Sequence, residues 1–360
     1  MTIDAKAGTV SRALAPAVAL ALVVLAACGD DGGLQRTSDE GGRARTVRVA
    51  DGFETDVDEG LSGTIRLAHG FGITYAPIQL ARELQVFEKK YPNVEVKWFE
   101  IASTSDQSAA MLAGDLDFPA CGADPIVVSW DAGVDWKVVQ MVSSFDAWLM
   151  VRPDGPDSVF DLVGTDMSIA PGPRTGQYYA VQKLLADDGR DPKALDRNWV
   201  DLAHPDAAQA LLGGQLDAHF ASTDFALRLQ EEGMKKISSF SEAYDGELYP
   251  LGVCALSSFE QKHPELVRAV ADIFRQTVEW MNDNPSEAAK LLARATRDSD
   301  QPVPASDFEA YLDSGIFHAI TSDAGLRHHA ELLTELGAID KRYTGAEDFY
   351  FYPEEAGSNW

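Results

Sequence analysis

Glycine and hydroxyl-bearing side chains gather at turns that precede predicted helices, around residues 71–76, 103–106, 122–126, 172–177 and 222–225. A helix N-terminus presents unpaired backbone N–H groups and a partial positive charge, so such a turn favours an anion. Hydroxyl groups there donate further hydrogen bonds, although Ser and Thr are also ordinary helix N-caps. The turns therefore predict a site for a polar small molecule. Its first candidates are Gly72, Ser103, Thr104, Ser105, Gly122, Thr175, Gly176, Ser222 and Thr223.

Four aromatic side chains stand at loop or helix-start positions in the same part of the sequence: Tyr75, Trp148, Tyr178 and Phe225. Aromatic rings commonly form the apolar floor of a small-molecule pocket. The alternative is that these rings pack in the hydrophobic core.

Charged side chains accompany the turns. Arg174 can pair with an anionic group through its forked guanidinium, or it stays solvated. Asp124 and Asp224 follow matching loops, where each can hold an ammonium or amino group or cap a helix. Together they favour a polar organic ligand with both signs of charge. A taurine-like or other small sulfonate or carboxylate fits, and so does an aminopyrimidine.

The histidines and cysteines do not form a recognisable catalytic or metal-binding motif. None of the seven histidines lies in a His-Glu-x-x-His sequence, and no Cys/His cluster has zinc spacing. A Gly-x-Ser-x-Gly elbow, a phosphate-binding Gly-x4-Gly-Lys loop and a dinucleotide-binding glycine turn are also missing. We therefore expect no catalytic residues, no metal and no cofactor, with an exported hydrolase as the open alternative.

The N-terminal segment predicts export. Lys6 and Arg12 precede an apolar run over 13–27, which is too short to span a membrane. The run ends in Leu25-Ala26-Ala27-Cys28, which resembles the lipobox of bacterial lipoproteins. We expect 1–27 to be a lipoprotein signal peptide and Cys28 to carry the lipid. The protein would then be anchored to the outer face of the bacterial cell membrane, or periplasmic. An uncleaved anchor and an ordinary signal with a chance cysteine remain alternatives.

Composition narrows the possible partners. The chain has 360 residues, enough for two domains, and 45% hydrophobic residues, enough for a full core. Its net charge of −27 repels nucleic-acid phosphates and anionic lipid headgroups. We expect a monomer that binds no nucleic acid and meets the membrane only through its lipid.

Strand and helix patterns alternate along the body of the chain. Residues 28–62 are rich in Gly, Asp, Glu and Arg and are predicted to be a flexible tether, with one short strand possible at 46–50. From Gly63 onward the alternation favours mostly parallel sheets with helices on their faces. The stripe of apolar residues over 264–282 predicts a long amphipathic helix.

An ordered set of short motifs resembles the solute-binding proteins of ABC importers, in the branch that includes nitrate, sulfonate, taurine and thiamine-precursor receptors. The set consists of 65–75, Ser103-Thr104-Ser105, the Ala-Gly-Asp-Leu-Asp-Phe turn at 113–118, Gly122-Ala123-Asp124-Pro125, Asp161-Leu162-Val163-Gly164, the glycine-rich turn at 172–176 and Gly214-Gln215-Leu216-Asp217-Ala218. The resemblance covers roughly 63–295. Three departures touch the predicted pocket: Ser103-Thr104, Pro173-Arg174-Thr175, and the missing Trp after 216–220.

The resemblance implies a bilobed, type II periplasmic-binding-protein-like α/β fold with two mostly parallel lobes. Lobe one is expected at 63–143 plus 253–360, including extra C-terminal helices, and lobe two at 144–252. Two crossing strands join the lobes near 143–145 and 248–252, and the turns named above converge on the cleft. Two independent consecutive domains are the alternative. Strands ending at Cys121 and Cys254 are neighbours in such a sheet, so a disulfide is possible; buried free thiols are the alternative.

The resemblance also implies a function. The protein is expected to capture a small polar organic solute, sulfonate- or taurine-like or a related organic acid, and to deliver it to an ABC permease and its cytoplasmic ATPase. The alternatives are an aminopyrimidine or aromatic ligand, a pyrimidine-synthesising relative of the same fold that uses a His, and an accessory lipoprotein without a transport role.

Overall fold

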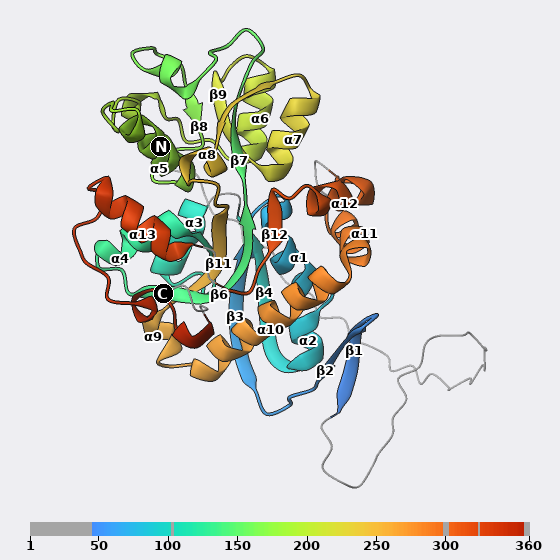
Figure 1. Cartoon of the computed structure of the whole chain (residues 1–360). Coiled ribbons are helices and arrows are strands. Elements are labelled where there is room, and N and C mark those ends of the chain that lie inside the picture. The colour runs from blue at the N-terminus through green and yellow to red at the C-terminus, as the bar shows by residue number, and fades with distance from the viewer. Residues whose placement is uncertain (1–44, 102–103, 298–301, 323–324, 356–360) are drawn as a thin grey trace, which may run out of the picture. The chain divides into compact units, whose positions relative to one another are not determined.

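The computed structural model describes residues 45–101, 104–297, 302–322 and 325–355. The predicted signal peptide at 1–27, Cys28 and Ser103 lie outside this part of the chain. The described residues form two α/β lobes that meet along crossing strands (Figure 1). None of the described helices combines the length and the apolar character that a membrane span requires.

Lobe one carries two sheets. Strands β3 (Ser62–His69) and β4 (Asn93–Glu100) pair in parallel. The second sheet has the order β12-β6-β11-β5 and is antiparallel throughout. Its strands are β5 (Ala120–Gly122), β6 (Trp136–Phe145), β11 (Tyr249–Leu256) and β12 (Phe317–Ala319). The helices of this lobe are α1 (Ala76–Glu83), α2 (Val86–Lys90), α3 (Thr104–Ala113), α4 (Ala123–Asp131), α9 (Ser257–Glu260), α10 (Pro264–Asp283), α11 (Pro285–Ala295), α12 (Ala305–Asp313) and α13 (Leu326–Glu335).

Lobe two is built on a mixed sheet with the order β10-β7-β9-β8. Its strands are β7 (Ala147–Val151), β8 (Ile169–Ala170), β9 (Ala218–Ser222) and β10 (Lys235–Ser239). Helices α5 (Gly176–Asp187), α6 (His204–Leu212), α7 (Thr223–Glu231) and α8 (Phe240–Ala243) surround it. Short 3₁₀ turns complete the described chain: η1 (Ile73–Tyr75), η2 (Val159–Leu162), η3 (Asp196–Asn198), η4 (Ala346–Asp348) and η5 (Pro353–Glu355).

The two lobes are connected where β6 runs into β7 and where α8 leads into β11. Asp146, the residue between β6 and β7, is buried, and its carboxylate accepts hydrogen bonds from the Ser241 backbone N–H at 3.0 Å and from Trp148 Nε1 at 3.0 Å. The Asp146 carbonyl accepts from Thr223 Oγ1 at 2.9 Å. Because a buried carboxylate needs several donors to be tolerated, this network fixes the course of the crossing strand.

Two expectations from the sequence need correction. Most of the strand ladders are antiparallel, because the crossing strands β6, β7 and β11 run against their neighbours; β3–β4 and β8–β9 are the parallel ladders among the described residues. The segment 45–62 is also not a flexible tether. There β1 (Thr46–Ala50) and β2 (Phe53–Asp56) form a hairpin, and Trp280 stacks on Phe53 and donates from Nε1 to the Asp51 carbonyl at 2.8 Å.

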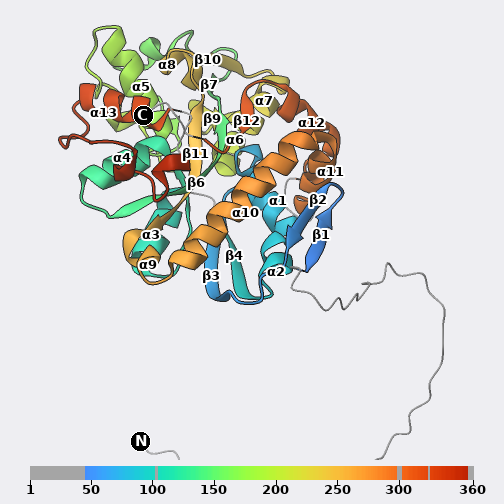
Figure 2. The same cartoon turned by 60° about the horizontal axis from the view of Figure 1, so that its bottom comes forward.

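The long amphipathic helix predicted over 264–282 is confirmed as α10. Its apolar stripe, which includes Leu266, Val270, Phe274 and Met281, is buried. Figures 1 and 2 show α10 lying across lobe one from the end near α9 to the end near α11. Since burying one large apolar side chain contributes about 1.5–3 kcal/mol, this single helix anchors the C-terminal half of the chain onto lobe one.

Strand β5 pairs with β11, with Cys121 opposite Gly252 and Ala120 opposite Val253. In this register the Cα atoms of Cys121 and Cys254 lie 6.1 Å apart, and the structure joins the two residues in a disulfide. The bridge closes a loop of 133 residues that contains all of lobe two. It therefore links β5 of lobe one to β11, the strand that returns from lobe two.

Breaking this bridge is expected to destabilise the protein by about 3–5 kcal/mol, because a long loop regains its entropy in the unfolded chain. Urea unfolding with and without a reductant measures the difference. The Cys121→Ala/Cys254→Ala double variant serves as the control and is expected to be as unstable as the reduced protein and insensitive to reductant. Equal stability of the oxidised and reduced wild-type protein would contradict the bridge.

Candidate functional site

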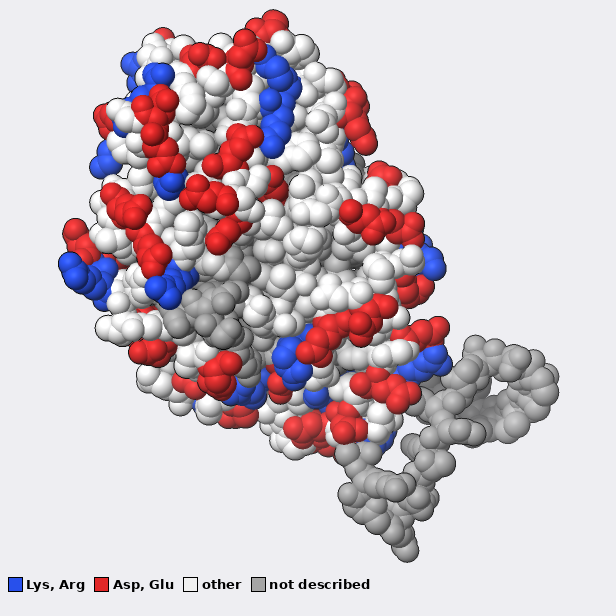
Figure 3. Space-filling model, in the orientation of Figure 1, with Lys and Arg blue, Asp and Glu red and all other residues white. Residues whose placement is uncertain are grey.

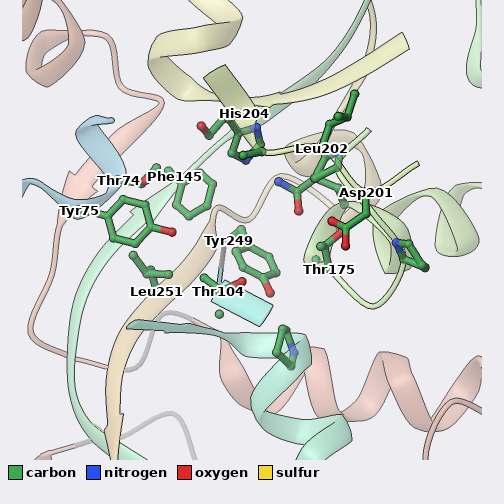
Figure 4. Close-up of a pocket in the computed structure, with 18 residues that line it drawn as sticks. Thr74, Tyr75, Thr104, Phe145, Thr175, Asp201, Leu202, His204, Tyr249 and Leu251 are labelled. Atoms are coloured by element: carbon green, nitrogen blue, oxygen red, sulfur yellow. The ribbon is translucent and has the colours of Figure 1, made fainter. Parts of the chain in front are cut away.

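A cavity of about 90 Å³ lies where the two lobes meet, beside the crossing strand β11. We call it the central cavity. Figure 4 shows Thr104, Thr175, His204 and Tyr249 around it, contributed by four different segments of the chain. Its lining residues are Thr74, Tyr75, Thr104, Gly122, Pro125, Phe145, Pro171, Pro173, Thr175, Gly176, Gln177, Asp201, Leu202, Ala203, His204, Ser222, Tyr249 and Leu251.

Five helices begin at this cavity, two from lobe one and three from lobe two. Their N-cap residues all line the cavity and are Tyr75 for α1, Gly122 for α4, Thr175 for α5, Ala203 for α6 and Ser222 for α7. Only Thr175 makes a side-chain capping hydrogen bond, which it accepts from the Tyr178 backbone N–H. The other four N-termini are left without a side-chain cap, so their first N–H groups and dipoles favour negative charge in the cavity.

The cavity wall is rich in hydroxyl groups and poor in charge. Hydroxyls come from Thr74, Tyr75, Thr104, Thr175, Ser222 and Tyr249. Ser222 Oγ is buried and has no hydrogen-bond partner among the described residues. Asp201 is the one acidic residue of the lining, and the described lining contains neither Lys nor Arg. Donors for an anion at this site are therefore uncharged backbone and hydroxyl groups.

The Tyr249 ring occupies the space between two N-cap regions. A Cβ atom added at Gly122 would lie 2.6 Å from the Tyr249 hydroxyl, and one added at Gly176 would lie 2.5 Å from the ring carbon Cζ. Tyr249 also accepts a hydrogen bond from the Asp124 backbone N–H at 3.1 Å. Glycine at both positions thus lets α4 of lobe one and α5 of lobe two approach the same ring.

Two histidines form a pair at the edge of the cavity. His204 Nδ1 lies 2.9 Å from His219 Nε2, and the His204 ring stacks on Phe225 at 5.8 Å. Desolvation lowers the pKa of His204 to about 4, and burial together with the neighbouring His204 lowers the pKa of His219 well below its ordinary value. Both imidazoles are consequently neutral at pH 7 and share one hydrogen between them.

Five of the predicted ligand-binding residues line the central cavity: Tyr75, Thr104, Gly122, Thr175 and Gly176. Ser222, which the turn pattern also indicated, is among the lining residues as well. Three further candidates line a second, larger cavity that shares no lining residue with the first: Gly72, Asp224 and Phe225. Ser103 lies outside the described residues, and Ser105 is the second residue of α3, whose side chain is not described.

The remaining candidates do not line the central cavity. Asp124 is buried and pairs with His329 Nδ1 at 2.7 Å. Trp148 donates to Asp146, and the hydroxyl of Tyr178 donates to Asp196 at 2.8 Å.

Arg174 is exposed and has a positive φ of 67°, so its side chain leaves the turn toward solvent. The hydroxyl of Thr223 donates a hydrogen bond to the Asp146 carbonyl. Neither Arg174 nor Thr223 contributes to the lining of the central cavity.

Sequence reasoning missed His204, Tyr249, Phe145 and Gln177 as lining residues. Tyr249 and Phe145 lie in strands that were interpreted only as crossings, although a bilobed fold places its crossing strands at the base of the cleft. His204 opens α6 directly after an Ala N-cap, so no hydroxyl or glycine marked that helix start. The described residues contain no group of three or more His, Cys, Asp or Glu side chains able to hold a metal ion.

Comparisons with known proteins agree with this geometry. A family model described as NMT1/THI5 like matches residues 73–288, which is more than half of the chain. A protein of Bacillus subtilis (strain 168), whose name assigns it provisionally to aliphatic sulfonates, is 26% identical over 241 residues, covering 65% of this chain and 70% of that protein.

Solved structures show the same fold. The alkanesulfonate-binding protein SsuA from Xanthomonas axonopodis pv. citri, bound to MOPS, has a TM-score of 0.65 at 18% identity and covers 81% of this chain and 99% of its own. The periplasmic aliphatic sulphonate binding protein SsuA from Escherichia coli has a TM-score of 0.59 at 19% identity, covering 81% and 98%. The periplasmic nitrate-binding protein NrtA from Synechocystis PCC 6803 has a TM-score of 0.55 at 14% identity, and the match covers 69% of each chain. The bilobed periplasmic-binding-protein fold is thereby confirmed.

The His204–His219 pair predicts that the fold weakens in acid. Because burial lowers both pKa values below 6.5, the unfolded chain binds protons before the folded protein does as the pH falls. The unfolding free energy should fall as the pH drops from about 6.5 to about 4, by roughly 2 kcal/mol between pH 7 and pH 5 for His204 alone.

Urea unfolding at the two pH values tests this, with the His204→Gln/His219→Gln variant as the control. The variant should lose less stability between pH 7 and pH 5 than the wild-type protein. The same loss in both proteins would show that the pair does not titrate as inferred.

Proposed function

Since the chain belongs to the NMT1/THI5-like family, we propose that the protein is the solute-binding component of an ABC importer and that its ligand is a small aliphatic sulfonate. The observation that carries the choice of ligand is the meeting of five helix N-caps at a cavity without Lys or Arg. A sulfonate is ionised at all ordinary pH values and offers three acceptor oxygens. N–H groups that point from several directions can satisfy all three.

The size and polarity of the central cavity favour this ligand over an aminopyrimidine. A volume of about 90 Å³ is well below the roughly 300 Å³ at which drug-sized sites begin. Asp124 and Asp224, the carboxylates predicted to hold an amino group, do not line this cavity, and Asp124 is already paired with His329. Asp201 is the one carboxylate of the lining that an aminopyrimidine would meet. The cavity suits a short anion whose charge sits in a compact head group.

The protein works by binding and not by catalysis in this proposal, as its solute-binding relatives do. The ligand contacts N-caps of both lobes at once, so it stabilises the arrangement in which the lobes meet. The free energy by which the ligand favours closure cannot exceed the difference between its binding free energies for the closed and open arrangements. The closed protein then delivers the solute to a permease and a cytoplasmic ATPase.

Calorimetric titration with ethanesulfonate, taurine, nitrate, an aromatic carboxylate and an aminopyrimidine tests the ligand class. We expect saturable binding of the sulfonates. The Ser222→Ala variant should bind them at least about tenfold more weakly, since a hydrogen bond to a charged group contributes about 1.5–3 kcal/mol.

Ser306→Ala, on the exposed start of α12, is the matched control and should bind like the wild-type protein. Preference for the aminopyrimidine, or no loss in Ser222→Ala, would count against the sulfonate site.

We also propose that the mature protein is a monomer held at the outer face of the cell membrane by a lipid on Cys28. The sequence Leu25-Ala26-Ala27-Cys28 after a short apolar run supports this anchor.

A Cys28→Ala variant, expressed in a bacterium that processes lipoproteins, should no longer fractionate with membranes. Mass spectrometry of the wild-type N-terminus should find Cys28 carrying acyl chains, which are absent from the variant. Wild-type protein that is soluble without detergent would contradict the anchor.

A further inference from the structure

A second cavity of about 620 Å³ lies between the lobes and shares no lining residue with the central cavity. Lobe one contributes residues from β3, β4, α1, α11 and α12, and lobe two contributes residues from α6 and α7. Figure 1 shows α6 and α7 facing α11 and α12 across this side of the molecule. We call this space the arginine-lined cavity, because Arg82, Arg228, Arg294 and Arg297 belong to its lining.

Two buried acceptor atoms at this cavity have no hydrogen-bond partner among the described residues: Gln79 Oε1 and Asp224 Oδ1. The residues are 7% and 2% exposed. Gln79 Nε2 donates to the Gly70 carbonyl at 3.3 Å, and this bond fixes which end of the amide is the oxygen. Because a buried acceptor without a donor is costly, an occupant of the cavity should bring N–H groups to this end.

Asp224 lies against the backbone of lobe one. Gly72 has a φ of 91°, and a Cβ atom there would lie 2.6 Å from Asp224 Oδ1, so only glycine allows the carboxylate to come this close. Burial raises the pKa of Asp224, while the positive charge of Arg228 and the backbone N–H groups of Ile73 and Phe225 act in the opposite direction. A cationic donor near Oδ1 would therefore be doubly favourable, through its hydrogen bond and its charge.

The arginines supply the opposite sign of charge. Arg82 Nη1 lies 3.0 Å from His69 Nε2, and burial lowers the pKa of His69, so the neutral ring accepts from the guanidinium and fixes its position. Arg294 approaches Glu287 at 3.8 Å, which leaves most of its donors to other partners. Guanidinium groups at this cavity suit a carboxylate or sulfonate through forked hydrogen bonds.

We propose that the arginine-lined cavity is a second binding site that takes a zwitterionic ω-amino acid. The ammonium group lies between Gln79 and Asp224, and the acidic group lies toward Arg82 and Arg294. This site is chemically distinct from the central cavity, whose lining offers no guanidinium, and it does not depend on what the central cavity binds. Its cavity is also large enough for an extended chain between the two charged ends.

Calorimetric titration of the intact protein tests the site, with 4-aminobutanoate and 6-aminohexanoate as probes and butanoate and hexanoate as partners that lack the ammonium. We expect at least one amino acid to bind saturably, and at least tenfold more tightly than its partner. Ethanesulfonate added beforehand should not compete. Competition, equal binding of the partners, or no saturable binding of either amino acid would overturn the proposal and leave the cavity filled by water alone.

Substitutions at Gln79 separate recognition from structure. Gln79→Leu removes both the acceptor and the donor to the Gly70 carbonyl and should weaken amino-acid binding at least tenfold. Gln79→Glu loses the same donor but keeps an acceptor and adds a negative charge, so it should bind the amino acid more tightly than Gln79→Leu does. Gln230→Leu, on the exposed face of α7, is the matched control and should change nothing. Equal loss in both Gln79 variants would show a structural effect and overturn the assignment. The sulfonate titration, repeated in Gln79→Leu, reports separately on the proposed function.

Discussion

The contact between one aromatic ring and two glycines governs the geometry of the site. Tyr249 stands on β11, and its ring reaches Gly122 of lobe one and Gly176 of lobe two so closely that no side chain fits at either position. Since each glycine is the N-cap or first residue of a helix, the ring brings two helix N-termini from different lobes to one place. The anion-favouring character of the central cavity follows from this approach, because separate N-termini would each remain exposed to water.

A buried polar network holds that ring in position. Asp124 pairs with His329 of α13, while Tyr244 donates toward Asp124 Oδ2 at 3.2 Å and toward the Gly176 carbonyl at 3.2 Å. One carboxylate thereby connects α4, the C-terminal helix α13 and the chain returning from lobe two. Burial raises the pKa of Tyr244 and Tyr249 well above 10, so both phenols keep their protons and remain donors. The C-terminal helices are thus part of the architecture of the site even though they contribute no lining residue to the central cavity.

The sequence predicted the places where ligand-facing turns occur better than it predicted which side chains face the ligand. Glycine and hydroxyl residues before helices carry a local signal, which is why Gly122, Thr175 and Ser222 were found. The role of Asp124 depends on His329, which is far away in the sequence, and the direction of Arg174 depends on a left-handed backbone. Neither feature can be recognised from the neighbouring residues in the sequence. The hairpin at 46–56 also depends on a distant partner. Its polar composition suggests a tether, but Trp280, more than two hundred residues later in the sequence, packs on Phe53 and holds the hairpin against lobe one. The motif order predicted the fold well, because a family resemblance includes long-range contacts that periodicity does not.

The surface of the protein is acidic, whereas the hydrogen-bond donors for an anion lie inside the central cavity. Acidic side chains are spread over both lobes on the face shown in Figure 3, and the whole chain carries 57 Asp and Glu against 30 Lys and Arg. At physiological ionic strength such surface charge is screened beyond about 8 Å, so an anion can approach the protein despite its sign. Once inside, it meets N–H groups and hydroxyls whose positions are fixed by the backbone. A flexible arginine in the same position would have to be desolvated and ordered for every binding event. The rigid donors therefore favour a compact, permanently ionised head group, and the guanidinium groups remain in the larger cavity, where an extended ligand has space to reach them.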